Sequence, residues 1–160
     1  MAKIIVGMAE LAVTKAPGIL TTLGLGSCVG IALYDRNTKI AGLAHIMLPD
    51  STKLQNNQNV GKFADTAMAK LVNDMVKLGA NKARLQAKIA GGAQMFAFNS
   101  KNEEMRIGDR NVEATLKLLK SYAIPLIAYE VGANYGRTVE LYADDGRFLI
   151  KTIGHGNRTL

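Results

Sequence analysis

Residues 23–48 read LGLGSCVGIALYDRNTKIAGLAHIML, and they contain the only cysteine of the chain and one of its two histidines. The stretch holds two apolar runs, 29–34 and 40–48, separated by the polar residues 35–39. Two apolar runs joined by a short polar turn are typical of a β-hairpin. We therefore expect a hairpin around which the rest of the chain is organised, with Cys28 at the start of one strand and His45 near the end of the other.

The length of the hairpin loop decides how these two side chains meet. If Arg36 and Asn37 alone form the loop, the numbers of paired residues sum to 73, and Cys28 lies directly opposite His45. Residues directly opposite share a face, with Cβ atoms about 4.5–5.5 Å apart, so that thiol and imidazole can touch. A shift of the pairing by one residue would put them on opposite faces.

The composition is that of a globular protein. The 160 residues are 48% apolar and 21% charged, which predicts one domain over 1–160, with a core at about 3–153 and a loose tail at 154–160. No apolar run approaches the roughly 20 residues of a membrane span, and the apolar run at the start is too short for a secretory signal. One cysteine cannot form an internal disulfide, and no Cys/His cluster has zinc spacing. We expect a cytoplasmic protein without membrane insertion, metal or other cofactor.

The net charge of +7 raises the question of nucleic-acid binding. The basic residues are dispersed, tryptophan is absent, and no basic stretch is interleaved with aromatic side chains, so the sequence does not favour a nucleic-acid partner. A basic surface that attracts an acidic protein is the better interpretation.

The remaining pattern predicts an α/β sandwich. An amphipathic helix is expected over 62–78, and a second one follows residue 108, capped by Asp109 or Asn111. The short connections between strands favour a mixed, largely antiparallel sheet. Besides the hairpin, strands are expected at 3–7 (with a continuation after a kink at 12–13 as an option), 19–23, 83–90, 125–131, 137–142 and 147–153. A polar loop is expected at 49–61, a helical turn at 93–96, a second loop at 99–104 and an exposed His155 in the tail.

Each candidate site residue also has an ordinary structural interpretation. Cys28 fits a small buried side chain as well as a nucleophile, and the match of Gly26-Ser27-Cys28-Val29-Gly30 to a nucleophile elbow is weak because a strand follows. Gly24 and Gly26 allow main-chain N–H groups to approach a substrate, and Ser27 either lends its N–H or points away. By spacing alone, His45 is a core histidine and Thr22 an ordinary strand threonine.

Five stretches together resemble the CheD family of chemoreceptor glutamine deamidases. The resemblance extends from about residue 3 to residue 153, and residues 130–134 depart from the family pattern before residues 136–138. The matching stretches are Thr22-Leu23-Gly24-Leu25-Gly26-Ser27-Cys28-Val29, Ala44-His45-Ile46-Met47-Leu48-Pro49-Asp50-Ser51, Lys62-Phe63-Ala64-Asp65-Thr66-Ala67, Lys88-Ile89-Ala90-Gly91-Gly92-Ala93-Gln94-Met95-Phe96 and Ile107-Gly108-Asp109-Arg110-Asn111-Val112.

The resemblance implies a three-layer α/β sandwich similar to the deamidase domain of cytotoxic necrotizing factor. It implies a cofactor-free hydrolase in which Cys28 is the nucleophile, His45 the general base and acid, and Thr22 the group that orients His45. Its substrates would be glutamine side chains of methyl-accepting chemotaxis receptors, and its partner the CheC phosphatase. A mainly non-catalytic module that binds receptors and CheC is the alternative; a thiol redox sensor is disfavoured because there is no second cysteine.

Overall fold

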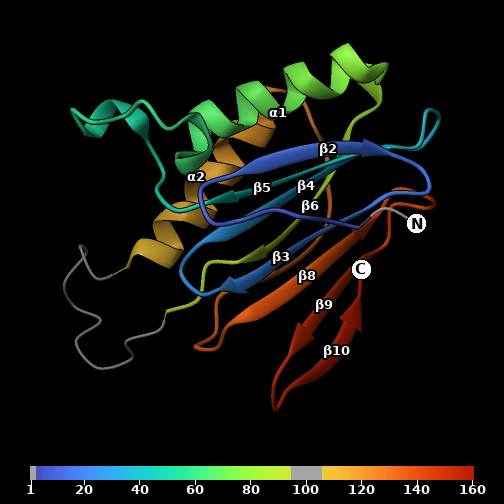
Figure 1. The fold of residues 1–160 in the computed structure, drawn as a ribbon. Helices are drawn as coiled ribbons and strands as arrows, with labels where there is room; N and C mark the ends of the chain where they lie inside the picture. Colours follow the sequence, from blue (N-terminus) through green and yellow to red (C-terminus); the bar gives the residue numbers. More distant parts are fainter. Residues whose placement is uncertain (1–2, 95–105) are drawn as a thin grey trace.

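The computed structural model describes residues 3–94 and 106–160, and within these ranges the strands form two five-stranded sheets (Figure 1). The central sheet has the order β2-β5-β4-β6-β7, and the outer sheet the order β1-β3-β8-β9-β10. The strands are β1 (Lys3–Ile5), β2 (Leu11–Lys15), β3 (Ile19–Leu25), β4 (Val29–Asp35), β5 (Ile40–Ile46), β6 (Gln86–Gly91), β7 (Leu126–Val131), β8 (Arg137–Tyr142), β9 (Phe148–Thr152) and β10 (Gly156–Thr159). The helices are α1 (Ala64–Leu78) and α2 (Ile107–Ser121), and the 3-10 turns are η1 (Ser51–Lys53), η2 (Val60–Lys62) and η3 (Lys82–Arg84).

Both sheets are mixed. The pairs β1–β3 and β6–β7 are parallel, and the other strand pairs are antiparallel. The expected mixed α/β class is therefore confirmed, but the single sheet is not. The chain changes sheets at a turn after β1, where the main-chain N–H of Gly7 donates to the Glu10 carboxylate at 2.7 Å. Residues 12–13 consequently lie in β2 of the central sheet instead of continuing the first strand.

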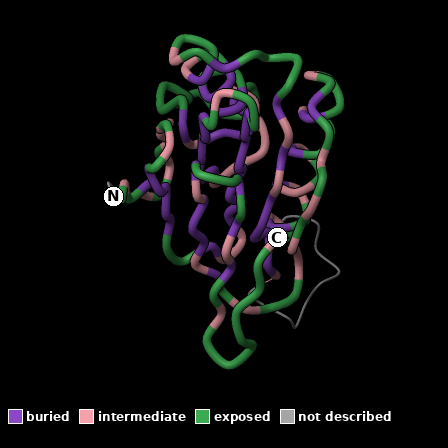
Figure 2. Tube along the Cα trace, turned by 90° about the vertical axis from the view of Figure 1, so that its right-hand side faces the viewer, coloured by how far each residue is buried: buried purple, intermediate pink, exposed green. Residues whose placement is uncertain are grey.

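The hairpin β4–β5 lies inside the molecule, as its two apolar runs predict. Every residue of both strands is buried, and one face of the hairpin packs against α1 (Figure 1). Gly42 makes room for this helix, because a Cβ there would lie 2.7 Å from the Met75 sulfur. The other face packs against the outer sheet, and the buried positions concentrate in the inner strands β3, β4, β5, β6 and β8 (Figure 2).

Both helices occur close to their expected positions. Met68, Leu71 and Met75 turn one face of α1 into the core, and Gly79 ends the helix with φ +123°. This left-handed conformation is one that glycine adopts without strain. The expected cap of α2 is wrong: the helix begins at Ile107 without a side-chain cap, so Asp109 and Asn111 lie within it.

The tail also differs from the prediction of a loosely held segment. Gly156–Thr159 form β10, which pairs with β9 along the edge of the outer sheet. His155 is exposed, as expected, and stacks on the Tyr135 ring with a centroid distance of 3.9 Å. The expected helical turn at 93–96 and the loop at 99–104 extend into, or lie entirely in, residues outside the described ranges.

Candidate active site

The hairpin places Cys28 and His45 on the same face, but not directly opposite each other. His45 pairs with Gly30 and Val29 pairs with Ile46, so paired numbers sum to 75 instead of 73. The loop therefore contains four residues, 36–39. The main-chain N–H of Lys39 donates to the Asp35 carbonyl at 2.8 Å, and Lys39 has φ +55°.

A shift of two residues keeps the faces and changes only the distance. Cys28 directly precedes β4, and continuing the register by one residue makes it a diagonal neighbour of His45; Gly30, opposite His45, has no side chain. Diagonal neighbours on one face are about 7–8 Å apart at Cα, within reach of long or aromatic side chains. The predicted direct pairing is wrong, whereas the shared face survives because the pleat has a period of two.

Thr22 reaches His45 from the other sheet. Its Oγ1 lies 2.7 Å from Nδ1 of His45 and 2.6 Å from the carbonyl oxygen of Val6, and both Thr22 and His45 are buried. A carbonyl oxygen can only accept, so the hydroxyl proton of Thr22 is used by Val6, and Oγ1 must accept a proton from Nδ1. This network assigns the Nδ1–H tautomer to His45.

The other ring nitrogen of His45 is consequently an acceptor. Nε2 is buried and has no hydrogen-bond partner among the described residues. It is therefore not hydrogen-bonded to the Cys28 thiol. An unprotonated Nε2 without a partner can accept the proton of a thiol or of a water molecule.

The electrostatics favour a neutral pair. Burial raises the pKa of the Cys28 thiol above its ordinary value of 9.0, although its own main-chain N–H lowers the pKa in part. Burial lowers the pKa of His45 below its ordinary 6.5. At neutral pH the site therefore contains a thiol and a neutral imidazole instead of an ion pair, which suits general-base activation of the thiol.

Residues 91–93, which we call the glycine cradle, support the chain around Cys28. The main-chain N–H groups of Gly92 and Ala93 donate to the carbonyls of Cys28 and Gly26, both at 2.8 Å. Gly91 and Gly92 have φ +112° and +63°, and a Cβ on Gly91 would lie 2.2 Å from the Cys28 carbonyl oxygen. The strand expected at 83–90 ends directly before these glycines, but their function in supporting the Cys28 segment depends on contacts between distant parts of the chain.

The residues of the expected substrate loop, Gly24, Gly26 and Ser27, are less buried than Cys28. Gly24 is exposed with φ +68°, has open space where a Cβ would be, and lies in a register shift between Thr22 and Leu25. Gly26 and Ser27 are partly buried. The Ser27 carbonyl accepts a hydrogen bond from the Asn111 side chain at 2.9 Å.

Arg137 connects the glycine cradle to residues 130–134, the segment that departs from the family pattern. Its buried guanidinium pairs with Glu130 at 2.6 Å and donates to the Gly91 and Gly132 carbonyls at 3.3 and 3.0 Å. Residues 130–132 are thereby connected to Gly91, which contacts the Cys28 carbonyl.

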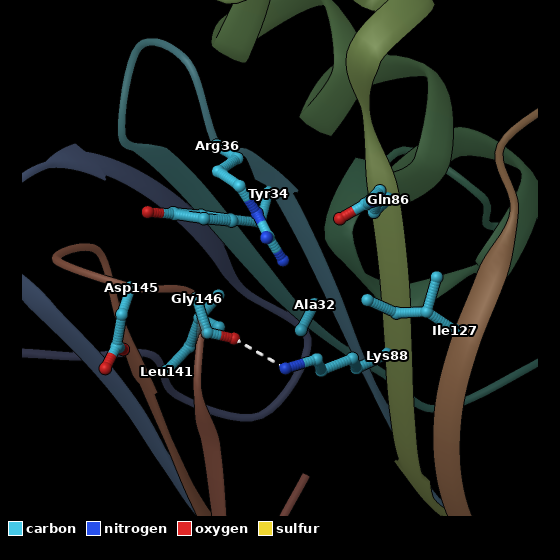
Figure 3. A pocket seen from close by; sticks show the side chains of 9 residues that line it. All are labelled: Ala32, Tyr34, Arg36, Gln86, Lys88, Ile127, Leu141, Asp145 and Gly146. Atoms are coloured by element: carbon cyan, nitrogen blue, oxygen red, sulfur yellow. Dashed lines mark hydrogen bonds between the residues drawn. The ribbon is translucent and has the colours of Figure 1, made fainter.

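A small pocket elsewhere does not contribute to this arrangement. It holds about 10 Å³, lies at the far end of β4 beside Tyr34 and Arg36, and has the Lys88 ammonium on one wall (Figure 3). Lys88 Nζ donates to the Gly146 and Leu160 main-chain oxygens at 2.9 and 2.8 Å. A space of this size accommodates about one water molecule, not a side chain of a substrate.

Neither a metal-ion site nor a membrane-spanning helix is found among the described residues. Residues 3–94 and 106–160 contain no cluster of three or more His, Cys, Asp or Glu side chains suited to a metal ion. Neither α1 nor α2, nor any other helix of those ranges, combines the length and apolar character needed to cross a bilayer.

The relationship to known proteins is clear. A family model described as CheD chemotactic sensory transduction matches residues 47–152. The chain belongs to the CheD family. This confirms the resemblance seen in the sequence motifs.

Curated CheD proteins match almost the entire chain. A protein of Caldanaerobacter subterraneus subsp. tengcongensis, named probable chemoreceptor glutamine deamidase CheD, is 59% identical over 151 residues, covering 94% of this chain and 93% of its own. One of Lachnoclostridium phytofermentans with the same name is 56% identical over 149 residues, covering 93% and 92%. Among solved structures, Neisseria meningitidis protein NMB0706, described as family DUF152, shows a distant likeness, with a TM-score of 0.49 and 6% identity over 84% of this chain and 64% of its own.

Proposed function

We propose that this protein is a chemoreceptor glutamine deamidase that uses Cys28 as nucleophile, His45 as general base and acid, and Thr22 to orient His45. The observation that carries the proposal is the hydrogen-bond network of Thr22, which leaves Nε2 of His45 buried and free to accept a proton. The printed names of the CheD relatives supply the reaction and the substrate class. The substrates are glutamine side chains on methyl-accepting chemotaxis receptors.

The first half of the reaction transfers an acyl group to sulfur. The Cys28 S–H bond breaks as its proton moves to Nε2 of His45, and the sulfur forms a bond with the carboxamide carbon. Main-chain N–H groups of the Cys28 segment donate to the oxyanion of this intermediate. His45 then returns the proton to the nitrogen, the C–N bond breaks, and ammonia leaves a thioester behind.

The second half restores the enzyme. His45 accepts a proton from water, the hydroxide attacks the thioester, and the C–S bond breaks as Cys28 recovers its proton. Glutamate is the product, and no metal or cofactor takes part. Because the Thr22 hydroxyl is neutral, it fixes the tautomer of His45 without giving the imidazolium the stabilisation of a carboxylate. Most of the rate acceleration must therefore come from positioning of the reacting groups and from the hydrogen-bond donors to the oxyanion. Each such donor raises kcat about 10²–10³-fold.

The partners and location follow from the same proposal. The protein acts in the cytoplasm on receptor helices and binds the CheC phosphatase, and its net charge of +7 promotes association with acidic protein surfaces. Receptor binding should weaken as salt rises, because counterions screen exposed charges. The likeness to the cytotoxic necrotizing factor domain remains a prediction about the fold.

Mass spectrometry of receptor peptides tests the reaction and the nucleophile together. Incubation with wild-type protein should raise the mass of selected glutamines by about one dalton, since OH replaces NH₂, and release ammonia. Cys28→Ala should do neither, while Ser27→Ala, altered at the adjacent residue, should retain the reaction. Modification by Cys28→Ala at the wild-type rate would refute the nucleophile. Receptor binding without any modification by the wild type would instead favour the non-catalytic module.

A further inference from the structure

Asn111 connects the two chain segments that carry the proposed catalytic pair. Its side-chain Nδ2 donates to the Ser27 carbonyl and to the Met47 carbonyl, each at 2.9 Å. Ser27 directly precedes Cys28, and Met47 lies two residues after His45. A single amide group on α2 thus holds both segments at a fixed separation.

The chemistry of the contacts fixes the orientation of this amide. Both partners are carbonyl oxygens, which only accept, so the NH₂ group must face them and both of its protons are used. Asn111 is completely buried, and its Oδ1 has no partner among the described residues. An unpaired buried acceptor is unfavourable, so an apolar side chain of similar size would avoid this cost. The two hydrogen bonds that the asparagine donates offset the cost of its unpaired Oδ1.

The start of α2 is built to bring Asn111 close. A Cβ on Gly108 would lie 2.5 Å from the Ala93 carbonyl and 2.6 Å from the Gly92 carbonyl, so only glycine permits this approach of the helix to the cradle. Val112 also packs against the core cluster that α1 forms with the central sheet. The helix is therefore seated on the segment that supports Cys28 from its other side.

We propose that Asn111 is a positioning residue that sets the separation between the Cys28 and His45 segments. This inference rests on the proposed function of that pair, but not on the identity of the substrate. Without the amide, the Ser27 and Met47 carbonyls lose their common donor, and the two segments move independently. Because a displacement of about 1 Å can cost about 10² in rate, we expect a large loss of turnover.

Asn111→Leu tests the inference against a matched control. Thr115→Val removes another buried polar group one turn further along α2, whose hydroxyl donates to the Asn111 carbonyl at 2.8 Å and does not reach the site segments. In a deamidation assay Asn111→Leu should reduce kcat about 10²-fold with little change in KM, whereas Thr115→Val should retain kcat. Equal kcat values in the two variants would overturn the inference.

Alkylation of Cys28 by iodoacetamide gives a readout that needs no receptor. In the wild type, burial suppresses formation of the thiolate. Asn111→Leu should release the Cys28 segment, so that alkylation becomes faster and its pH profile moves to lower pH, while Thr115→Val should keep the wild-type profile. An unchanged profile in Asn111→Leu overturns the inference. If the wild type shows no deamidation but the profiles differ as expected, the proposed function fails and the positioning role stands.

Asn111→Ser serves if the leucine variant does not fold. The serine hydroxyl has one proton and cannot donate to two carbonyls at once, and the smaller side chain creates no steric conflict. The same shift in the alkylation profile is expected. A wild-type profile in folded Asn111→Ser would contradict the inference.

Discussion

Replacing Thr22 with valine removes one hydroxyl group and leaves the shape of the side chain nearly unchanged. The Val6 carbonyl then loses its donor at 2.6 Å, and Nδ1 of His45 loses its acceptor at 2.7 Å. Each buried polar group left without a partner costs about 1–3 kcal/mol. The added methyl group offsets up to about 0.8 kcal/mol. The free energy of unfolding should therefore fall by about 1–5 kcal/mol.

The substitution should also slow catalysis. Without the Thr22 hydroxyl, no acceptor holds the imidazole proton of His45 on Nδ1. The proton can then move to Nε2, and a protonated Nε2 cannot accept the proton of the Cys28 thiol. The wrong tautomer of a catalytic histidine can cost about 10⁴ in kcat, and we expect a loss of about 10²–10⁴ here.

Two measurements on three proteins decide this prediction. Urea denaturation gives the stability, and ammonia release from receptor fragments, under conditions in which each variant is folded, gives kcat. Thr22→Ser is the control, since it keeps the hydroxyl and loses only a methyl group. The reasoning fails if Thr22→Val retains kcat within a few-fold of the wild type, or if Thr22→Ser loses as much activity as Thr22→Val.

Three further predictions concern acid stability, histidine burial and the glycine cradle. Burial would raise the pKa of Asp35, but hydrogen bonds led by that from Arg84 outweigh it and hold the pKa at about 2 instead of 3.8. The ionised Asp35 carboxylate, with all the hydrogen bonds that it accepts, therefore stabilises the fold by about 2 kcal/mol above pH 3.8, and this contribution is lost as the pH falls toward 2. Acid titration of Asp35→Asn should show a lower stability at neutral pH and a smaller decrease of stability in acid. Because burial lowers the pKa of folded His45 below 6.5, the value of the unfolded residue, wild-type stability should fall as the pH drops through 6.5 and below. His45→Gln should show a flatter profile in denaturation experiments. Gly91→Ala should lower the melting temperature more than Gly24→Ala, since both have positive φ but only Gly91 faces a carbonyl, at 2.2 Å; equal effects would contradict the steric argument.

The shared face of Cys28 and His45 could be predicted because it depends only on local alternation. Side chains alternate in any hairpin, and the structure keeps an odd sum of paired numbers. The loop length could not be predicted in the same way. The Asp35 carboxylate accepts from the main-chain N–H of Asn37 in the loop and from that of Asn81, 46 residues away. Such long-range contacts fix the position of the turn and leave no local signature.

The candidate site also depends partly on long-range contacts that the sequence does not indicate. Thr22 and His45 lie in different sheets and touch only after the sheets pack, so their spacing in sequence carries no signal, and only the resemblance to CheD proteins connected them. Asn111 and Ser27 are 84 residues apart. The sequence placed Asn111 near the start of a helix but could not indicate the contacts that its side chain makes.

Two hydrogen bonds across the interface between the sheets have different consequences, because only one of them reaches the candidate site. Tyr34 also connects the sheets, donating from its hydroxyl to the Ala143 carbonyl at 2.7 Å. That bond contributes to packing at one end of the interface, where no reacting group lies. The Thr22–His45 bond crosses the same interface at the other end and determines which imidazole nitrogen carries the proton. Packing of the sheets is therefore part of the proposed chemistry at the Thr22 end, because the acceptor at Nε2 exists only while the outer sheet holds its hydroxyl against the central one.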